Sequence, residues 1–426
     1  MGIRSRQSLL VWTASVLTLA GLGGGVAWRV LGPTAHSKAE AIETVRRALD
    51  RNDPVAARPH VDHCLARWPN DERVLFLAVQ VARRSDAYAD AERFLALYEK
   101  AIGSTEASRL EWVLLGVQQG DFGDAERRLL EAVTRRDQDS LSILEALAKG
   151  YRAARRPEAV PVLKRLLDLD PDHVSALLLR GDMLDTARQT EAAEKDFRRA
   201  VDIAPANAAA QSALAGLLSR AGRTREAIYH YELAHSLQPT DPGPLLGLAR
   251  ALADAAELTQ AQQRLDELLA NHPDHVDGLV ERARLSLRQG QAKQAEPFLE
   301  QAVRAAPWHR DGQQLYMVVL SELGPKEAAS QCTTRLAQLR DEDAAVGRLK
   351  LRARDTPGDQ GIRWDLWQWS VRNGQSAEGL SWLLRILMTD PRNSRAHLAL
   401  ADYLDRAGQS RRAAQHRAEA GNPTRG

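Results

Sequence analysis

Histidine and cysteine side chains at helical spacing are the first groups in this chain that could do chemistry. His60, His63 and Cys64 lie within about one helical turn, and imidazole nitrogen and thiolate sulfur are common ligands of Zn²⁺. Near the other end, His397 and His416 fall in two consecutive segments of helical composition, where their side chains could meet. A metal or catalytic site is one interpretation of these residues, and helix packing and capping is the other.

No established catalytic motif supports the first interpretation. The sequence has no Gly-x-Ser-x-Gly, no His-Glu-x-x-His and no glycine-rich phosphate loop that follows a strand. Its two cysteines, Cys64 and Cys332, lie far apart, and we expect free thiols rather than a disulfide. We therefore expect no catalysis, no cofactor and no metal, because packing and turn roles account for the histidines.

Three arginines are the second chemical candidate. Arg250 and Arg284 are 34 residues apart, and Arg288 follows Arg284 by one helical turn. Guanidinium groups form paired hydrogen bonds with carboxylates, so two arginines on neighbouring helices could grip an acidic side chain or a chain terminus. Solvated helix faces explain the same residues without a partner. The interval of 34 residues matters because it is also the period of the whole chain.

The period is clearest between Val174 and Asp241, where a 34-residue unit occurs twice in succession. Small residues coincide at positions 8, 20 and 27 of the two copies, and proline coincides at position 32. The same interval places the starts of nine units at Lys38, Glu72, Glu106, Ser140, Val174, Ala208, Pro242, Val276 and Arg310. Position 20 is alanine in all nine units, which predicts a close approach of two helices because a larger side chain would force them apart.

This period, with its small residues and its proline, resembles the tetratricopeptide repeat. The resemblance implies a helix–turn–helix in each unit and an all-α fold, an α-solenoid of about eleven stacked repeats. Nine repeats span residues 38–343, and two further ones span 360–426, where the polar last helix is expected to cap the stack. Residues 344–359 interrupt the period, and either an over-long second helix or an extra linker helix accounts for them.

Residues 1–37 precede the repeats and are expected to form a basic leader and one transmembrane helix. Residues 8–28 carry no charge, and 21 residues at about 1.5 Å each can cross a bilayer core of roughly 30 Å. We expect an uncleaved single-pass anchor; a signal peptide cleaved near Ala27 is the alternative. The positive charges on the two sides are nearly balanced. We expect the repeats on the extracytoplasmic side, with the cytoplasmic face as the alternative.

The resemblance also implies a partner surface, because positions 2, 5, 9 and 12 of the family's first helices line a concave groove. Position 5 is apolar in nine of eleven units, which predicts an apolar track for a hydrophobic peptide or an amphipathic helix if those side chains are exposed. The candidate groove residues are Phe76, Leu110, Leu144, Leu178, Leu246, Arg250, Val280, Arg284, Arg288 and Trp364. Trp364 belongs to a group of tryptophans that either repacks the core of the tenth unit or anchors a partner.

Composition adds one exclusion. The formal net charge is +2 over 426 residues, so no global basic signal for nucleic acid is present. We expect a membrane-anchored scaffold that binds a protein or peptide without catalysis, in envelope assembly or export. A regulatory or accessory subunit of a membrane-bound enzyme complex is the alternative, and composition does not separate the two.

Overall fold

The computed structural model describes residues 38–421 except 123–124, 136–138, 325 and 357, and its regular elements are 22 helices. The first helices of the units are α2 (Lys38–Asp50), α4 (Glu72–Arg84), α6 (Glu106–Gln118), α8 (Ser140–Ala153), α10 (Val174–Thr186), α12 (Ala208–Arg220), α14 (Pro242–Asp254), α16 (Val276–Arg288), α18 (Arg310–Leu323), α20 (Gln360–Arg372) and α22 (Ser394–Arg406). The second helices are α3 (Pro54–Arg67), α5 (Tyr88–Ile102), α7 (Ala125–Arg135), α9 (Ala159–Leu169), α11 (Thr190–Ile203), α13 (Thr224–Leu237), α15 (Leu258–Asn271), α17 (Ala292–Ala305), α19 (Lys326–Asp355), α21 (Ser376–Thr389) and α23 (Ser410–Gly421). All eleven first helices begin at the residues that the period predicts.

Helix starts are fixed by side chains that cap the free backbone N–H groups of the first turn. The Nδ1 atoms of His173, His275 and His309 each accept a backbone N–H three residues further on, at 3.3, 3.1 and 3.0 Å. Asn207 and Asp359 cap α12 and α20 in the same way through their side-chain oxygens. His173, His275 and His309 all stand at position 34 of their units, and all three are capping residues.

The small residues of the period lie where the two helices of a unit touch. Ala193, Ala227 and Ala261, all at position 20, have no exposed surface. At position 8, a Cβ on Gly181 would lie 2.4 Å from the Phe197 ring, so glycine is required for α10 to approach α11 this closely. In the tenth unit Trp367 takes position 8, and Gly379 takes position 20 opposite it. Position 20 is alanine in the first nine units, and the glycine here leaves room for the larger Trp367, whose ring would lie 3.6 Å from a Cβ on Gly379.

The break in the period is explained by α19, which runs without interruption over 30 residues. Residues 344–355 therefore continue the second helix of the ninth unit, which decides between the two alternatives. The extension carries Val346, which packs with Leu366 and Trp382 of the tenth unit. The longer helix thus supplies the apolar contact on which α20 and α21 are built.

First helices lie on the inner side of the curved stack. Along much of the stack, from α2 to α18, each first helix contacts the first helix of the next unit, whereas consecutive second helices make no comparable contact. In a curved array, the elements nearest the centre of curvature lie closest together. The first helices therefore line the concave face, as the resemblance implies.

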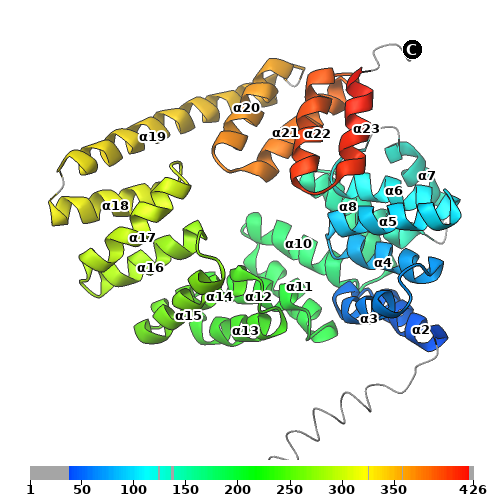
Figure 1. Ribbon diagram of the computed structural model, residues 1–426, viewed down its shortest axis with the longest axis horizontal. Coiled ribbons are helices and arrows are strands. Elements are labelled where there is room, and N and C mark those ends of the chain that lie inside the picture. Colours follow the sequence, from blue (N-terminus) through cyan, green and yellow to red (C-terminus); the bar gives the residue numbers. More distant parts are fainter. Residues whose placement is uncertain (1–37, 123–124, 136–138, 325, 357, 422–426) are drawn as a thin grey trace, which may run out of the picture.

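The stack curves back on itself, so that its C-terminal units meet the second to fourth units (Figure 1). The expected cap is thus a wrong interpretation of α23: Gln409, Arg412 and His416 are 3–5% exposed because they face polar groups of the earlier units. The side-chain amides of Gln119 and Gln409 bond to each other across this junction. We call the contact of α21 and α23 with α5 and with the ends of α6 and α8 the closure interface.

The predicted membrane helix, residues 8–28, lies outside the described residues. Within the described ranges, no helix combines the length and the apolar character needed to cross a bilayer. The predicted free thiols are confirmed, since Cys64 and Cys332 are both unpaired and buried.

Candidate functional site

The apolar residues predicted to line the groove are largely covered by neighbouring helices. Leu144, Leu246 and Val280 are at most 8% exposed. Four more are partly buried: Phe76, Leu110, Leu178 and Trp364. Leu110 and Leu178 pack against the core cluster that contains Leu147, and Phe76 and Trp364 pack against two other clusters. Leu398 is the one apolar residue at position 5 that is exposed in the described units. The concave face therefore does not present the apolar track that this position predicts, because position 5 is used for helix packing.

Polar residues of the first helices supply the chemistry of the concave face instead. Arg250 on α14 donates its Nε–H to Glu281 on α16 at 2.9 Å, and Arg284 places its Nε 3.2 Å from the other oxygen of the same carboxylate. Arg284 also contacts Asp311 on α18 at 3.3 Å. Arg250 and Arg284 thus share one carboxylate, which belongs to the chain itself; their binding of a partner carboxylate stays a prediction.

Arg288 completes this group from the last turn of α16. It donates one N–H to the backbone oxygen of Ala253 on α14 at 3.0 Å, and among the described residues no carboxylate lies within ion-pair distance of it. Arg250 and Arg284 keep 47% and 40% of their side chains exposed, whereas Glu281 keeps 16%. We call Arg250, Arg284 and Arg288 with Glu281 the arginine cluster.

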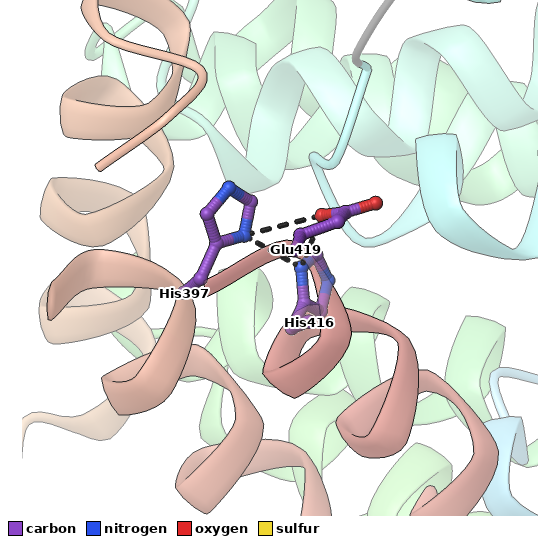
Figure 2. Close-up of side chains that lie close together, drawn as sticks. All are labelled: His397, His416 and Glu419. Carbon is purple, nitrogen blue, oxygen red and sulfur yellow. Dashed lines mark hydrogen bonds and ion pairs between the residues drawn. The ribbon is translucent and has the colours of Figure 1, made fainter. Parts of the chain in front are cut away.

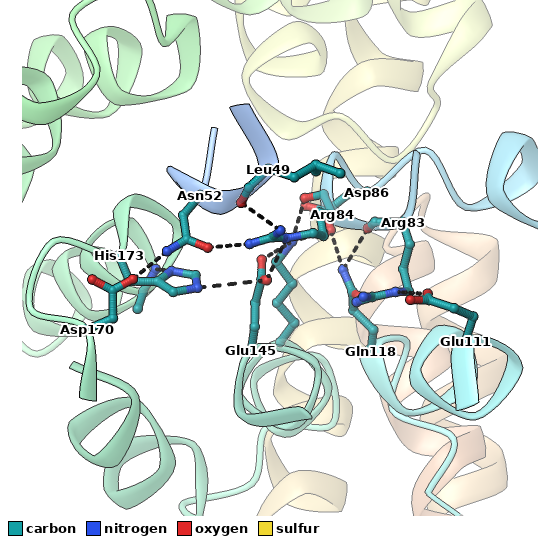
Figure 3. A network of polar contacts seen from close by, with 12 residues as sticks. Leu49, Asn52, Arg83, Arg84, Asp86, Glu111, Gln118, Glu145, Asp170 and His173 are labelled. Carbon is teal, nitrogen blue, oxygen red and sulfur yellow. Dashed lines mark hydrogen bonds and ion pairs between the residues drawn. The ribbon is translucent and has the colours of Figure 1, made fainter. Parts of the chain in front are cut away.

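A second polar group, shown in Figure 3, is buried between the first four units. Arg84 reaches from α4 to Glu145 on α8 at 3.3 Å and to the backbone oxygen of Leu49 at 3.0 Å, and it also bonds to Asn52. Asn52 in turn bonds to Asp170, in the turn after α9. These contacts join the first unit to the end of the fourth, so they hold the N-terminal units in a tight coil.

Glu145 is the centre of charge in this buried group. Burial alone would raise the pKa of its carboxyl, but the Lys149 ammonium at 3.4 Å and the Arg84 guanidinium hold that pKa well below the ordinary value. Beside it, burial lowers the pKa of His173, whose Nε2 lies 3.9 Å from the Glu145 carboxylate. The contacts of this group fix the geometry of the units.

Tryptophans of the tenth unit are packed rather than displayed. Trp364 and Trp367 lie with ring centroids 4.6 Å apart, and the guanidinium of Arg395 covers the Trp364 ring at 3.8 Å. Trp382 is 7% exposed. These contacts favour the repacked core over an aromatic anchor for a partner.

The histidines fall into different environments. His60 and His63 are exposed while Cys64 is buried, so these three side chains do not share a face. Among the described residues, the one group of three possible metal ligands that converge is His397, His416 and Glu419, in the last unit. The sequence predicts that the two histidines could meet. It does not predict the roles of Glu419, which lies beside them, or of Glu281, which pairs with Arg250 and Arg284, because neither glutamate belongs to a motif.

The chain is an α-solenoid: its helices form pairs that stack on one another, and the first helices of the pairs form the inner face. Family models of the tetratricopeptide repeat match residues 150–208 and 218–283. The chain therefore carries tetratricopeptide repeats, as the 34-residue period predicts. No curated protein sequence matches the chain.

Solved structures similar to the chain include several repeat proteins. PilW, a type IV pilus biogenesis factor, is 22% identical over 46% of this chain and 91% of its own, with a TM-score of 0.43. Pseudomonas aeruginosa pilF is 17% identical over 50% and 93% of the two chains, with a TM-score of 0.42. Human IFIT1 is 13% identical over 91% and 95%, also with a TM-score of 0.42. These values are too low to transfer the role of any of these proteins.

Proposed function

We propose that the chain is a membrane-anchored scaffold that binds an extended segment of a partner protein along its concave face, without catalysis. The segment carries at least one carboxylate, which meets the arginine cluster on α14 and α16. Residues 8–28 hold the scaffold to the membrane, and the repeats lie on the extracytoplasmic side, where envelope assembly or export takes place.

One observation carries the proposal: the guanidinium groups of Arg250 and Arg284 share the single carboxylate of Glu281, and both keep unused donors. A guanidinium has five N–H donors, and Arg250 uses only its Nε–H in the bond to Glu281. Arg288 uses one donor on a backbone oxygen. The remaining N–H groups of the cluster are available to oxygens of a bound segment.

The internal ion pairs are weak enough to be exchanged. Because Arg250 and Arg284 are about half exposed, their pairs with Glu281 are screened by water and contribute roughly 1 kcal/mol or less. A partner carboxylate that excludes water from the same donors gains a stronger, charge-assisted bond. The exchange of Glu281 for a partner oxygen is therefore favourable on binding.

Closure of the stack makes the concave face a preformed surface. The closure interface and the buried group around Glu145 restrain the curvature of the stack at its two ends, so little backbone order has to be gained when a segment binds. Preorganisation of this kind raises affinity by reducing the entropy lost on association.

Site-directed photocrosslinking tests the proposal in the intact chain. A photoreactive residue in place of Gln314, exposed on α18 at the predicted groove position 5, should capture a discrete partner in cells, whereas the same residue in place of Gln263, exposed on the second helix α15, should not. Arg250→Ala with Arg284→Ala should reduce the capture at least tenfold, and Arg264→Ala on α15 should leave it unchanged. Equal capture by the two variants would overturn the proposed role of the arginine cluster.

A further inference from the structure

His397 on α22 and His416 on α23 turn the same ring atom toward each other. Their Nδ1 atoms lie 3.0 Å apart, and one oxygen of Glu419 lies 3.2 Å from the first and 3.3 Å from the second (Figure 2). Both histidines are at most 5% exposed, while the Glu419 side chain is 44% exposed. Three atoms with lone pairs thus lie close together. The two histidines among them are buried, and the glutamate is exposed to solvent.

The contacts of the two Nε2 atoms determine the protonation of the facing Nδ1 atoms. His397 Nε2 lies 2.9 Å from the backbone oxygen of Pro391, and His416 Nε2 lies 3.3 Å from a carboxylate oxygen of Asp121. Both partners can only accept hydrogen bonds, so each Nε2 carries a proton. In the neutral rings each Nδ1 is then a bare lone pair, and two lone pairs and a carboxylate oxygen at this distance repel one another unless a cation lies between them.

Metal-binding histidines have this arrangement of outer contacts. A ligating imidazole almost always donates its other N–H to a backbone carbonyl or a carboxylate, which fixes the tautomer and the direction of the ring. His397 and His416 make one contact of each kind. We propose that His397, His416 and Glu419 bind a divalent transition-metal ion through the two Nδ1 atoms and a carboxylate oxygen, with Zn²⁺ as the ion that this ligand set suits.

The distances between the ligand atoms fit a tetrahedral ion. Ligands about 2.05 Å from Zn²⁺ at tetrahedral angles lie roughly 3.3 Å from one another, and the three separations here are 3.0, 3.2 and 3.3 Å. His416 and Glu419 are three residues apart and so share one face of α23. A fourth ligand can be water, because the Glu419 side chain is 44% exposed.

Charges around the site also favour a cation. Asp121 and Glu419 bring two carboxylates, and Arg412 brings one guanidinium 3.6 Å from Asp121. The local sum is one negative charge, which an ion with two positive charges more than offsets. A proton shared between the rings is the rival occupant, because the two carboxylates also raise the pKa of His416 to about 9, against the lowering effect of burial.

The site belongs to the closure interface, which gives the ion a structural consequence. Asp121 lies in the segment after α6, about 300 positions before its partner His416, so an ion on His416 strengthens a contact between the two ends of the stack. Metal binding should therefore stabilise the closed arrangement as well as the last unit, because an ion that binds only the folded state raises its stability by mass action.

Calorimetric titration of the chelator-treated full chain with Zn²⁺ tests the proposal. We expect one ion per chain, a rise in Tm on binding, and the visible absorption of a tetrahedral site when Co²⁺ replaces Zn²⁺. Glu419→Gln, which changes an exposed side chain, should weaken binding at least tenfold, and Asp121→Asn should weaken it roughly 10–100-fold through the outer contact. His60→Ala with His63→Ala removes two exposed histidines elsewhere and should change neither the stoichiometry nor the affinity.

Two results would overturn the metal site. One is a wild-type dissociation constant for Zn²⁺ weaker than about 100 µM, together with a ¹⁵N spectrum that shows a proton shared by the two Nδ1 atoms. The other is an affinity that is the same in the wild type, in Glu419→Gln and in His397→Gln, with all three folded by circular dichroism.

Discussion

The side-chain amides of Gln119 and Gln409, 290 residues apart in the chain, donate to each other at 3.0 and 2.9 Å. Both are buried, and the oxygen of each amide accepts an N–H from the other. Arg412 adds a third bond by donating to the Gln409 oxygen at 2.9 Å. This reciprocal pair is the centre of the closure interface, and it turns a linear array into a closed one.

Gln409→Leu is expected to open the closure interface without unfolding the repeats. The change leaves the Gln119 side-chain oxygen and one Arg412 N–H buried without a partner, which costs about 1–3 kcal/mol, whereas Gln119 Nε2 keeps its bond to the Leu115 backbone oxygen at 3.1 Å. Amide hydrogen exchange in α23 should become faster, and the radius of gyration in solution should increase. Gln415→Leu, at an exposed site on the same helix, is the control and should change neither quantity. Unaltered exchange in Gln409→Leu would show that the two ends do not depend on this pair.

A linear array follows from the sequence, but its closure does not. The phase of the alanines gives the start of the first helix in each of the nine units from Lys38 to Arg310, because each unit contacts mainly its neighbours and repeats the same pattern. Closure depends on small rotations summed over all units and on single pairs such as Asp121 with His416, which belong to no period. The sequence does show that α23 has a polar face. Polar residues suit a face in contact with water and a face in contact with another polar surface equally well, so the sequence does not distinguish the two.

Glu145 should make the stability of the N-terminal units sensitive to acid. Its folded-state pKa lies below the ordinary value of 4.5, so its charge contributes stability that is complete above pH 4.5 and is lost as the pH falls further. At pH 7, Glu145→Gln leaves Lys149 and Arg84 without their shared carboxylate and should lower the free energy of unfolding by about 3–5 kcal/mol. The deficit should shrink progressively below pH 4.5.

Urea unfolding of both proteins between pH 7 and pH 3 measures this difference. Glu131→Gln, on an exposed position of α7, should follow the wild type throughout. A deficit for Glu145→Gln that stays constant down to pH 3 would contradict a depressed carboxyl pKa in the folded state.

Ala193→Leu should destabilise the fifth unit by over-packing. Ala193 has no exposed surface and lies where α11 meets α10, so the added carbon atoms would push the helices apart at a cost of roughly 1–3 kcal/mol. Ala192→Leu, one residue earlier on the exposed side of the same helix, should have little effect. Thermal unfolding compares the two; equal melting temperatures would mean that position 20 is not a helix contact.

The full-length chain should remain in the membrane fraction after an alkaline carbonate wash. Residues 8–28 are uncharged and long enough to span a bilayer, whereas a chain that begins at Lys38 lacks them and should be recovered in the supernatant. Release of the full-length form would remove the anchor from the proposed function.

The orientation of the repeats is a separate prediction with its own measurement. Protease added to cells with an opened outer layer should digest the repeats if they lie outside the cytoplasm. A cytoplasmic protein serves as the internal control and should stay intact. Protection of the repeats under these conditions would place them on the cytoplasmic side.

Glu281→Gln should strengthen partner binding if a partner carboxylate competes with Glu281 for the arginine cluster. The charge of Glu281 now occupies the Nε–H of Arg250 and lies 3.2 Å from Nε of Arg284. Removing that charge frees both guanidinium groups, and the half-exposed pairs lost contribute about 1 kcal/mol or less, so the free energy of unfolding should change little. In the wild type, a partner carboxylate has to displace Glu281 and lose the free energy of these pairs. Without that loss, the affinity for the partner should rise about two- to fivefold.

Titration of the captured partner segment against the wild type, Glu281→Gln and Glu267→Gln measures this gain. Glu267 pairs with Arg264 at 3.1 Å on the second helix α15, so its neutralisation changes charge equally but away from the concave face and should leave affinity unchanged. A weaker affinity in Glu281→Gln would mean that Glu281 holds the arginines in place for the partner rather than competing with it. An affinity unaltered in Glu281→Gln, together with unaltered crosslinking in Arg250→Ala with Arg284→Ala, would exclude α14 and α16 as the binding surface.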